Sequence, residues 1–194
     1  MVENHLIIFV KNPIPGTVKT RIARTVGNER AVHVYKHLLQ HTQDITQSLP
    51  YRRIVYYGDF INPDDGWNAY EKQLQSGDDL GQRMLNAFRA QFEAGAGRVC
   101  IIGSDCLAIT SNHIRLAFEA LNQADVVIGP ATDGGYYLLG MKQLHPALFE
   151  NMPWSQPELR QLTELAMLQN GLTFERLEEL SDIDEWDDYQ RATQ

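Results

Sequence analysis

A cluster of cations near the N-terminus is the first group of residues whose types and spacing suggest chemistry. Residues 11–21 contain Lys11, Lys19 and Arg21 in a chain whose formal charge is −8. A Lys ammonium is a point charge, and an Arg guanidinium matches phosphate oxygens as a fork. Gly16 allows a ligand to approach the backbone closely, and N–H groups at a helix start favour anions. We therefore expect a phosphate-binding loop here, with a solvated basic turn as the alternative.

Carboxylates at two other places have the character of metal ligands. Asp105 lies at the carboxyl end of the apolar, strand-like segment 98–103, one residue beyond it in the sequence Gly103-Ser104-Asp105. Asp182 and Asp184 alternate in an acidic segment near the C-terminus. Mg²⁺ usually takes one or two protein carboxylates and leaves its other positions to water and substrate phosphates. Asp105 is thus the candidate first ligand of Mg²⁺ or Mn²⁺, and Asp182 or Asp184 the second. Helix capping and favourable placement at a helix start are the alternatives for these carboxylates.

Two glycine-containing segments are candidate walls of the same site. In the segment 129–137, Asp133 would contact a sugar hydroxyl or an acceptor and Tyr136 would pack on a ring, although a plain hairpin turn explains Asp-Gly-Gly equally well. In the segment 77–84, Gly81 would border the donor and Arg83 would meet a phosphate or carboxylate, with a capped helix start as the alternative.

Elements of an α/β fold alternate along the chain and would position these residues. Apolar runs of strand length recur between amphipathic stretches, which is typical of a parallel sheet covered on both faces. The expected strands are residues 5–10, 53–57, 98–103, 125–129, 136–141 and 172–177, and the expected helices are residues 28–48, 79–93, 111–123, 156–170 and 185–193. Ser111 is the expected N-cap of the helix at 111–123.

The strands at 125–129 and 136–141 are too close for a helical crossover, so they form a hairpin or one of them lies outside the main sheet. Ligands of open α/β sheets bind beyond the carboxyl ends of strands, where the candidate residues fall.

Length and composition limit the classes of protein to which the chain can belong. The length of 194 residues, without repeats or linkers, predicts a single domain. The acidic balance argues against nucleic acid as a partner, and no stretch has the length or apolar character of a membrane span. A cytoplasmic location and buried, reduced cysteines are the corresponding expectations. The spacing of the Lys19 loop differs from GxxxxGK[ST], which disfavours a P-loop NTPase.

Taken as an ordered set, the segments resemble a known family. KNPIPGTVKTRIA, GDDLGQRM, GSDC, GPATDGGYYLLG, PWS and DIDEWDD occur in the order seen in small bacterial glycosyltransferase-like proteins of the nucleotide-diphospho-sugar transferase superfamily, some of which are labelled arsenosugar-biosynthesis glycosyltransferases. The resemblance extends from residue 6 to residue 189. The chain is similar more distantly to molybdenum-cofactor and phospholactate guanylyltransferases.

The resemblance implies a GT-A fold, a Rossmann-like three-layer sandwich with a mostly parallel central sheet. By matching position, it implies donor-phosphate contacts from Lys11, Gly16, Lys19 and Arg21, a metal at Asp105 with Asp182 or Asp184, and an acceptor side at Asp133, Gly134 and Gly135. Two departures affect loop geometry: Leu107-Ala108 stand where the family has proline after GSDC, and Glu185-Trp186 replace Thr-Pro after DID.

The expected activity is transfer from a nucleotide or nucleotide-sugar donor to a small-molecule acceptor. In glycosyl transfer, Lys19, Arg21 and an Asp105-bound metal would stabilise the leaving diphosphate, and Asp133 would orient or deprotonate the acceptor. The alternative is nucleotidyl transfer from an NTP to a phosphorylated small molecule, which the three cations of the loop would suit. A nucleotide-binding module without catalysis is the third hypothesis.

Overall fold

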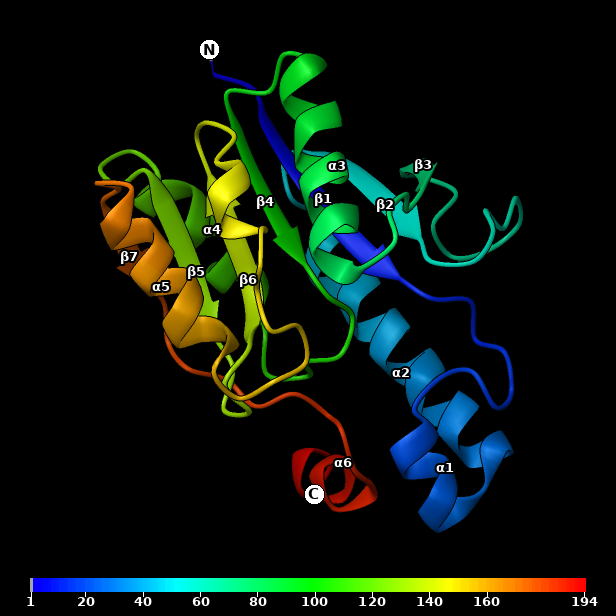
Figure 1. The fold of residues 1–194 in the computed structure, drawn as a ribbon. Coiled ribbons are helices and arrows are strands. Elements are labelled where there is room, and N and C mark those ends of the chain that lie inside the picture. Colours follow the sequence, from blue (N-terminus) through cyan, green and yellow to red (C-terminus); the bar gives the residue numbers. More distant parts are fainter. Residues whose placement is uncertain (1) are drawn as a thin grey trace.

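The computed structural model, which describes residues 2–194, contains one seven-stranded sheet with helices on both faces (Figure 1). The strand order is β3-β2-β1-β4-β6-β5-β7. All neighbouring strands are parallel except β6, which is antiparallel to both β4 and β5. The strands are β1 (Asn4–Val10), β2 (Arg52–Tyr57), β3 (Glu71–Leu74), β4 (Arg98–Ile102), β5 (Val126–Pro130), β6 (Tyr136–Met141) and β7 (Phe174–Arg176).

The helices form two layers because strand side chains alternate between the faces of the sheet. Leu6 and Ile8 of β1 are fully buried under one layer, and Ile7 is fully buried under the other. The first layer contains α1 (Thr20–Val26), α2 (Asn28–Thr46), α4 (Ser111–Ala120) and α6 (Trp186–Ala192). The second contains α3 (Leu80–Glu93), the 3₁₀ turn η1 (Pro146–Leu148) and α5 (Leu159–Gln169). The predicted three-layer α/β fold with a mostly parallel sheet is confirmed.

The hairpin alternative for the fifth and sixth strands is the one observed. β5 and β6 pair antiparallel, and β6 lies inside the sheet between β4 and β5. Gly140 makes this possible, because a Cβ there would lie 2.5 Å from the Cys100 sulfur.

Three local features differ from the sequence expectations. Residues 20–26 form a separate helix, α1, which ends at Gly27 with a left-handed φ of 85°. The short edge strand β3 was not expected, because its residues are mostly exposed and lack an apolar pattern. The N-cap of α4 is Thr110, whose backbone N–H donates to His113 Nδ1, whereas the Ser111 hydroxyl donates to the Ile45 carbonyl.

Within residues 2–194, none of the helices combines the length and the apolar character needed to cross a membrane.

Candidate active site

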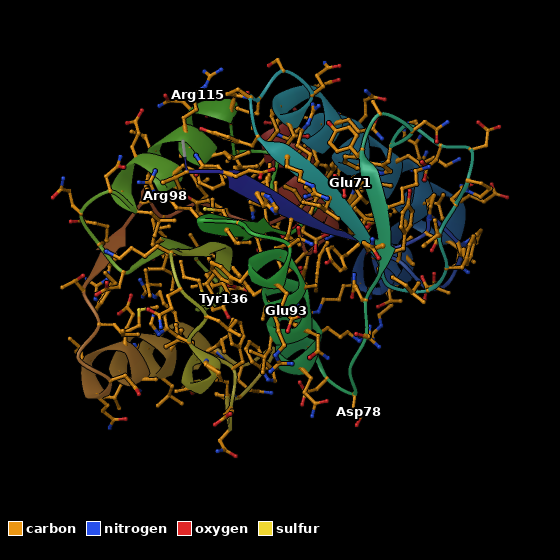
Figure 2. All side chains as sticks on the ribbon, turned by 90° about the horizontal axis from the view of Figure 1, so that it is seen from above. Glu71, Asp78, Glu93, Arg98, Arg115 and Tyr136 are labelled. Atoms are coloured by element: carbon orange, nitrogen blue, oxygen red, sulfur yellow. The ribbon has the colours of Figure 1, made fainter. Side chains whose placement is uncertain are left out.

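A cleft of about 920 Å³ opens at the carboxyl ends of β1 and β4. These strands are parallel neighbours, so the loops that follow them begin at the same edge of the sheet. Residues from the loop before α1, the loop after β4, the start of α3 and the segment before α6 line the cleft. In Figure 2, Asp78 marks the outer loop before α3 and Tyr136 lies near the middle of the molecule.

A buried tyrosine joins the two central loops. Tyr35 reaches from α2 into the cleft, where its hydroxyl accepts the Lys11 backbone N–H at 2.8 Å. The same oxygen lies 3.1 Å from the Ser104 hydroxyl. Sequence reasoning missed Tyr35 because it falls among the core positions of an amphipathic helix and resembles any other packing residue. It sets the separation between the loop after β1 and the loop after β4.

Lys19 and Asp105 meet in this cleft, as the sequence predicts. The Lys19 ammonium lies 2.6 Å from Asp105 Oδ1 and donates to the Ile183 carbonyl at 2.7 Å. The Lys19 side chain is only 7% exposed, whereas that of Asp105 is 50% exposed. A largely buried ammonium is therefore held against a carboxylate that still faces the open cleft.

The acidic segment before α6 is fixed against the same loops. The Ile183 N–H donates to the Asp105 carbonyl at 2.8 Å, and Arg21 lies 3.6 Å from Asp184 Oδ2. Asp182 and Asp184 both line the cleft. The structure thus gathers the cations of the first loop and the carboxylates of two distant segments in one place.

Asp182 is the most perturbed acid of this group. Burial, and after it the neighbouring carboxylates of Asp105, Asp133 and Asp184, raise its pKa to about 7 against the opposing effect of Lys19. One of its oxygens, Oδ1, is buried without a hydrogen-bond partner among the described residues. Burial also raises the pKa of Asp184. The site therefore carries more negative charge than its own cations balance.

Asp182→Asn should stabilise the metal-free protein at pH 8. A carboxyl with a raised folded-state pKa favours folding when protonated, so ionised Asp182 destabilises the native state above pH 7. The gain in Tm should shrink as the pH falls through about 7 towards the ordinary carboxyl range. Thermal unfolding in EDTA between pH 5 and 8.5 measures it, with exposed Asp187→Asn as control. A gain that does not vary with pH would contradict this charge balance.

The other predicted site residues divide into two groups. Lys11, Arg83, Asp133, Gly135 and Tyr136 line the cleft together with the residues described above. Gly16, Gly81 and Gly134 do not line it. Gly16 lies in an exposed turn with a left-handed φ of 83°. The ligand roles assigned to all of these residues stay predictions.

Gly81 and Gly134 instead leave room for the loop of residues 153–157 to pack closely against them. A Cβ at Gly81 would lie 2.3 Å from the Trp154 ring, and one at Gly134 would lie 2.1 Å from the Pro157 carbonyl oxygen. Trp154 and Pro157 also line the cleft. The double glycine and the glycine at the start of α3 thus allow this loop to form a wall of the cleft, a role that the sequence motifs did not reveal.

Cys106 lines the cleft but is not poised as a nucleophile. Burial, together with the nearby carboxylate of Asp182, raises the pKa of its thiol to about 12. The thiol donates to the Ser181 carbonyl at 3.4 Å. A protonated, hydrogen-bonded thiol agrees with the expected structural role of this cysteine.

Metal-ligand geometry is not formed among the side chains of the described chain, residues 2–194. No group of three His, Cys, Asp or Glu residues there is arranged to hold a metal ion. The Lys19 ammonium contacts Asp105 in this arrangement.

Fold and cleft together define a protein of the nucleotide-diphospho-sugar transferase fold class. A crystal structure from Desulfovibrio desulfuricans G20, provisionally assigned as a nucleotide-diphospho-sugar transferase, is 32% identical with a TM-score of 0.89, and the match covers 95% of this chain and 84% of that one. Residues 43–156 match the family described as "Uncharacterized protein conserved in bacteria (DUF2064)". The chain belongs to this DUF2064 family, and the predicted relationship to nucleotide-diphospho-sugar transferases is confirmed.

More distant structures share the fold. CMP:2-keto-3-deoxy-manno-octonic acid synthetase, complexed with CTP, is 12% identical with a TM-score of 0.58, and the match covers 97% of this chain and 96% of that one. The Rv0371c protein from Mycobacterium tuberculosis H37Rv, in complex with manganese, is 12% identical with a TM-score of 0.57, over 98% of this chain and 97% of that one. No curated protein matches the sequence.

Proposed function

We propose that this protein is a metal-dependent transferase that moves a glycosyl group from a nucleotide sugar to a small acceptor. The observation that carries the proposal is the contact between Lys19 and Asp105 inside the cleft. It places a phosphate-binding type of cation beside a half-exposed carboxylate at the carboxyl edge of the sheet, where open α/β folds bind nucleotides. The D. desulfuricans relative supports the choice of donor.

The carboxylates fit a divalent cation by their chemistry. Asp105, Asp182 and Asp184 offer hard oxygen ligands, which Mg²⁺ and Mn²⁺ prefer. Asp182 Oδ1 is buried without a partner among the described residues, and its environment has an excess of negative charge. We assign Asp105 and either Asp182 or Asp184 as the residues that would hold the ion. When bound, the ion would neutralise charge on the diphosphate of the donor.

The remaining chemistry falls to side chains of the cleft. Lys19 and Arg21 bind the diphosphate and stabilise the charge that develops as the sugar–phosphate bond breaks. Asp133 accepts the proton of the acceptor hydroxyl while the hydroxyl oxygen forms the new bond to the sugar carbon. Tyr136 and Gly135 form the acceptor wall beside it. Lys11 and Arg83 line the donor part of the cleft.

Nucleotidyl transfer is the second candidate. Three cations of the segment 11–21, Lys11, Lys19 and Arg21, line the cleft together with Arg83, which suits a triphosphate. The synthetase with the same fold was solved in complex with CTP. A phosphate oxygen of the acceptor would then attack the α-phosphorus, and pyrophosphate would leave.

A ligand panel separates the hypotheses. Thermal shifts are measured with NTPs and nucleotide sugars, with and without Mn²⁺, because a ligand at 100 times its Kd stabilises by about 2.7 kcal/mol. The ligands that bind are then tested for turnover with sugars, sugar phosphates and other small hydroxyl compounds as acceptors. Release of a nucleoside diphosphate supports glycosyl transfer, and release of pyrophosphate supports nucleotidyl transfer. Binding without consumption indicates a non-catalytic module, and the absence of any binding contradicts all three.

Arg21→Ala should weaken binding of a nucleoside diphosphate by about 10- to 100-fold, because a hydrogen bond to a charged group contributes about 1.5–3 kcal/mol. Binding of the bare nucleoside should change little. Isothermal titration of both ligands measures the difference, with Arg24→Ala, an exposed arginine of the same helix, as control. Equal weakening of both ligands would move Arg21 away from the phosphates.

The proposal places the protein in the cytoplasm. Both cysteines, Cys100 and Cys106, are free and buried, which agrees with a reducing compartment.

A further inference from the structure

The Lys19 side chain is placed as a fixed cation rather than as a mobile surface lysine. Its ammonium contacts Asp105 Oδ1 and the Ile183 carbonyl, and only 7% of the side chain is exposed. Burying an ammonium is costly unless opposite charge and hydrogen bonds compensate, and both are present here. The side chain is thus held in place by groups from two segments that are distant in sequence.

The backbone of Lys19 is also specialised. The residue is the N-cap of α1 with φ 48° and ψ 47°, in the left-handed region. A residue with a Cβ is strained there, so the surrounding structure must compensate for the strain. Among the described residues, only Asn151 and Ser155 are other non-glycine residues with positive φ. The strained conformation coincides with the residue whose ammonium enters the acidic cluster.

The acidic cluster around Lys19, formed by Asp105, Asp182 and Asp184, has more carboxylates than the Lys19 ammonium and the Arg21 guanidinium balance. Asp105 keeps half of its side chain exposed to the cleft, and Asp182 Oδ1 stays buried without a partner in residues 2–194. We propose that the Lys19 ammonium is an internal stand-in for the metal ion at Asp105. A divalent cation binds Asp105 only when Lys19 leaves it, and the phosphates of the donor favour that move by binding the released ammonium.

This inference rests on the proposed function and adds that binding of the metal and binding of the donor are coupled through Lys19. If Lys19 and the metal compete for Asp105, the metal alone binds weakly and the donor makes metal binding stronger. Linkage then requires that the metal strengthens donor binding by the same factor. The protein would avoid holding a bare metal ion in an empty cleft.

Mn²⁺ alone is the probe, so the test does not depend on knowing the donor. Free and bound Mn²⁺ are measured by electron paramagnetic resonance in Lys19→Met and in the unaltered protein. Removing the competing cation should tighten Mn²⁺ binding by about tenfold or more, since a 1.4 kcal/mol change in charge interaction is a factor of ten. The matched control is Lys36→Met, which removes one positive charge from an exposed position on α2. The double variant Lys19→Met with Asp105→Asn should not show this gain in Mn²⁺ affinity.

A second measurement uses the unaltered protein and decides the question even if Lys19→Met does not fold. N-hydroxysuccinimide acetate labels accessible lysines, and peptide mass spectrometry compares Lys19 with Lys36. Saturating Mn²⁺ should raise acetylation of Lys19 several-fold, because its ammonium moves into solvent, and should leave Lys36 unchanged.

Any of three results would overturn the proposal. The first is an unchanged Mn²⁺ affinity in folded Lys19→Met, and the second is a gain in Mn²⁺ affinity that persists when Asp105→Asn is added. The third is acetylation of Lys19 that does not change with Mn²⁺. These results are independent of turnover. Tighter Mn²⁺ binding in Lys19→Met without any product from the ligand panel would leave the stand-in role intact and defeat the transferase proposal. Product formation by the unaltered protein, with unchanged Mn²⁺ affinity in Lys19→Met, would support the transferase proposal and defeat the stand-in role.

Discussion

Asp105→Asn should lower the turnover of the proposed transferase by about 1,000-fold or more. The substitution keeps the size of the side chain but removes the carboxylate that contacts Lys19 and is the proposed metal ligand. Loss of metal-based charge stabilisation costs several kcal/mol in the transition state, and about 4 kcal/mol corresponds to a factor of 1,000. Initial rates of nucleotide release at saturating donor and Mn²⁺ measure the effect.

The control for this prediction is Asp187→Asn. Asp187 is an exposed carboxylate in the first turn of α6, close in sequence to the acidic segment, and does not line the cleft. It removes the same charge without touching Lys19 or the proposed ligands. If Asp105→Asn retained turnover comparable to that of Asp187→Asn, Asp105 would have no part in the metal site.

Gly134→Ala should destabilise the protein by about 2–4 kcal/mol, the sum of backbone strain and overpacking. Gly134 has a left-handed φ of 91°, and a Cβ there would lie 2.1 Å from the Pro157 carbonyl oxygen. That oxygen belongs to the backbone, so the loop at 153–157 must move as a unit. Because this loop forms a wall of the cleft, donor or acceptor binding should weaken as well. Urea denaturation at equilibrium measures the change in the free energy of unfolding.

Gly95→Ala separates strain from steric overlap. Gly95 has nearly the same φ, 94°, but no atom lies within 4 Å of the position that a Cβ would take there. It should therefore show the strain alone, about 1 kcal/mol. Equal losses in the two variants would mean that the Pro157 contact adds nothing at Gly134.

Most of the fold was predictable because burial leaves a strong pattern in the sequence. The central strands β1 and β4 are continuous apolar runs, which only a sheet covered on both faces can bury. The edge strand β3 has no such pattern because its residues are mostly exposed. Helix α1 was missed because its seven residues bury only one side chain, Ile22, so the segment shows no amphipathic repeat.

The site was predictable where its residues lie in the loops that follow the central strands. Asp105 and Lys19 follow neighbouring parallel strands, so topology brings their loops together. Tyr35 reaches the cleft from a position that looks like an ordinary packing residue, and nothing local in the sequence marks it. Trp154 belongs to the PWS motif, but the motif alone assigned it no place in the cleft. The glycines were noticed for the right reason, close approach, but the group that approaches Gly134 is the backbone of another loop rather than a ligand.

The central claim is that a metal-bridged phosphate lies between Asp105 and the Lys19 loop. Electron–nuclear double resonance of Mn²⁺ detects coupling to ³¹P when a phosphate oxygen is a ligand of the ion. With the nucleotide that gives the largest thermal shift, we expect strong ³¹P coupling in the unaltered protein and its loss in Asp105→Asn. Bound nucleotide without ³¹P coupling to Mn²⁺, or coupling that survives Asp105→Asn unchanged, would contradict the claim.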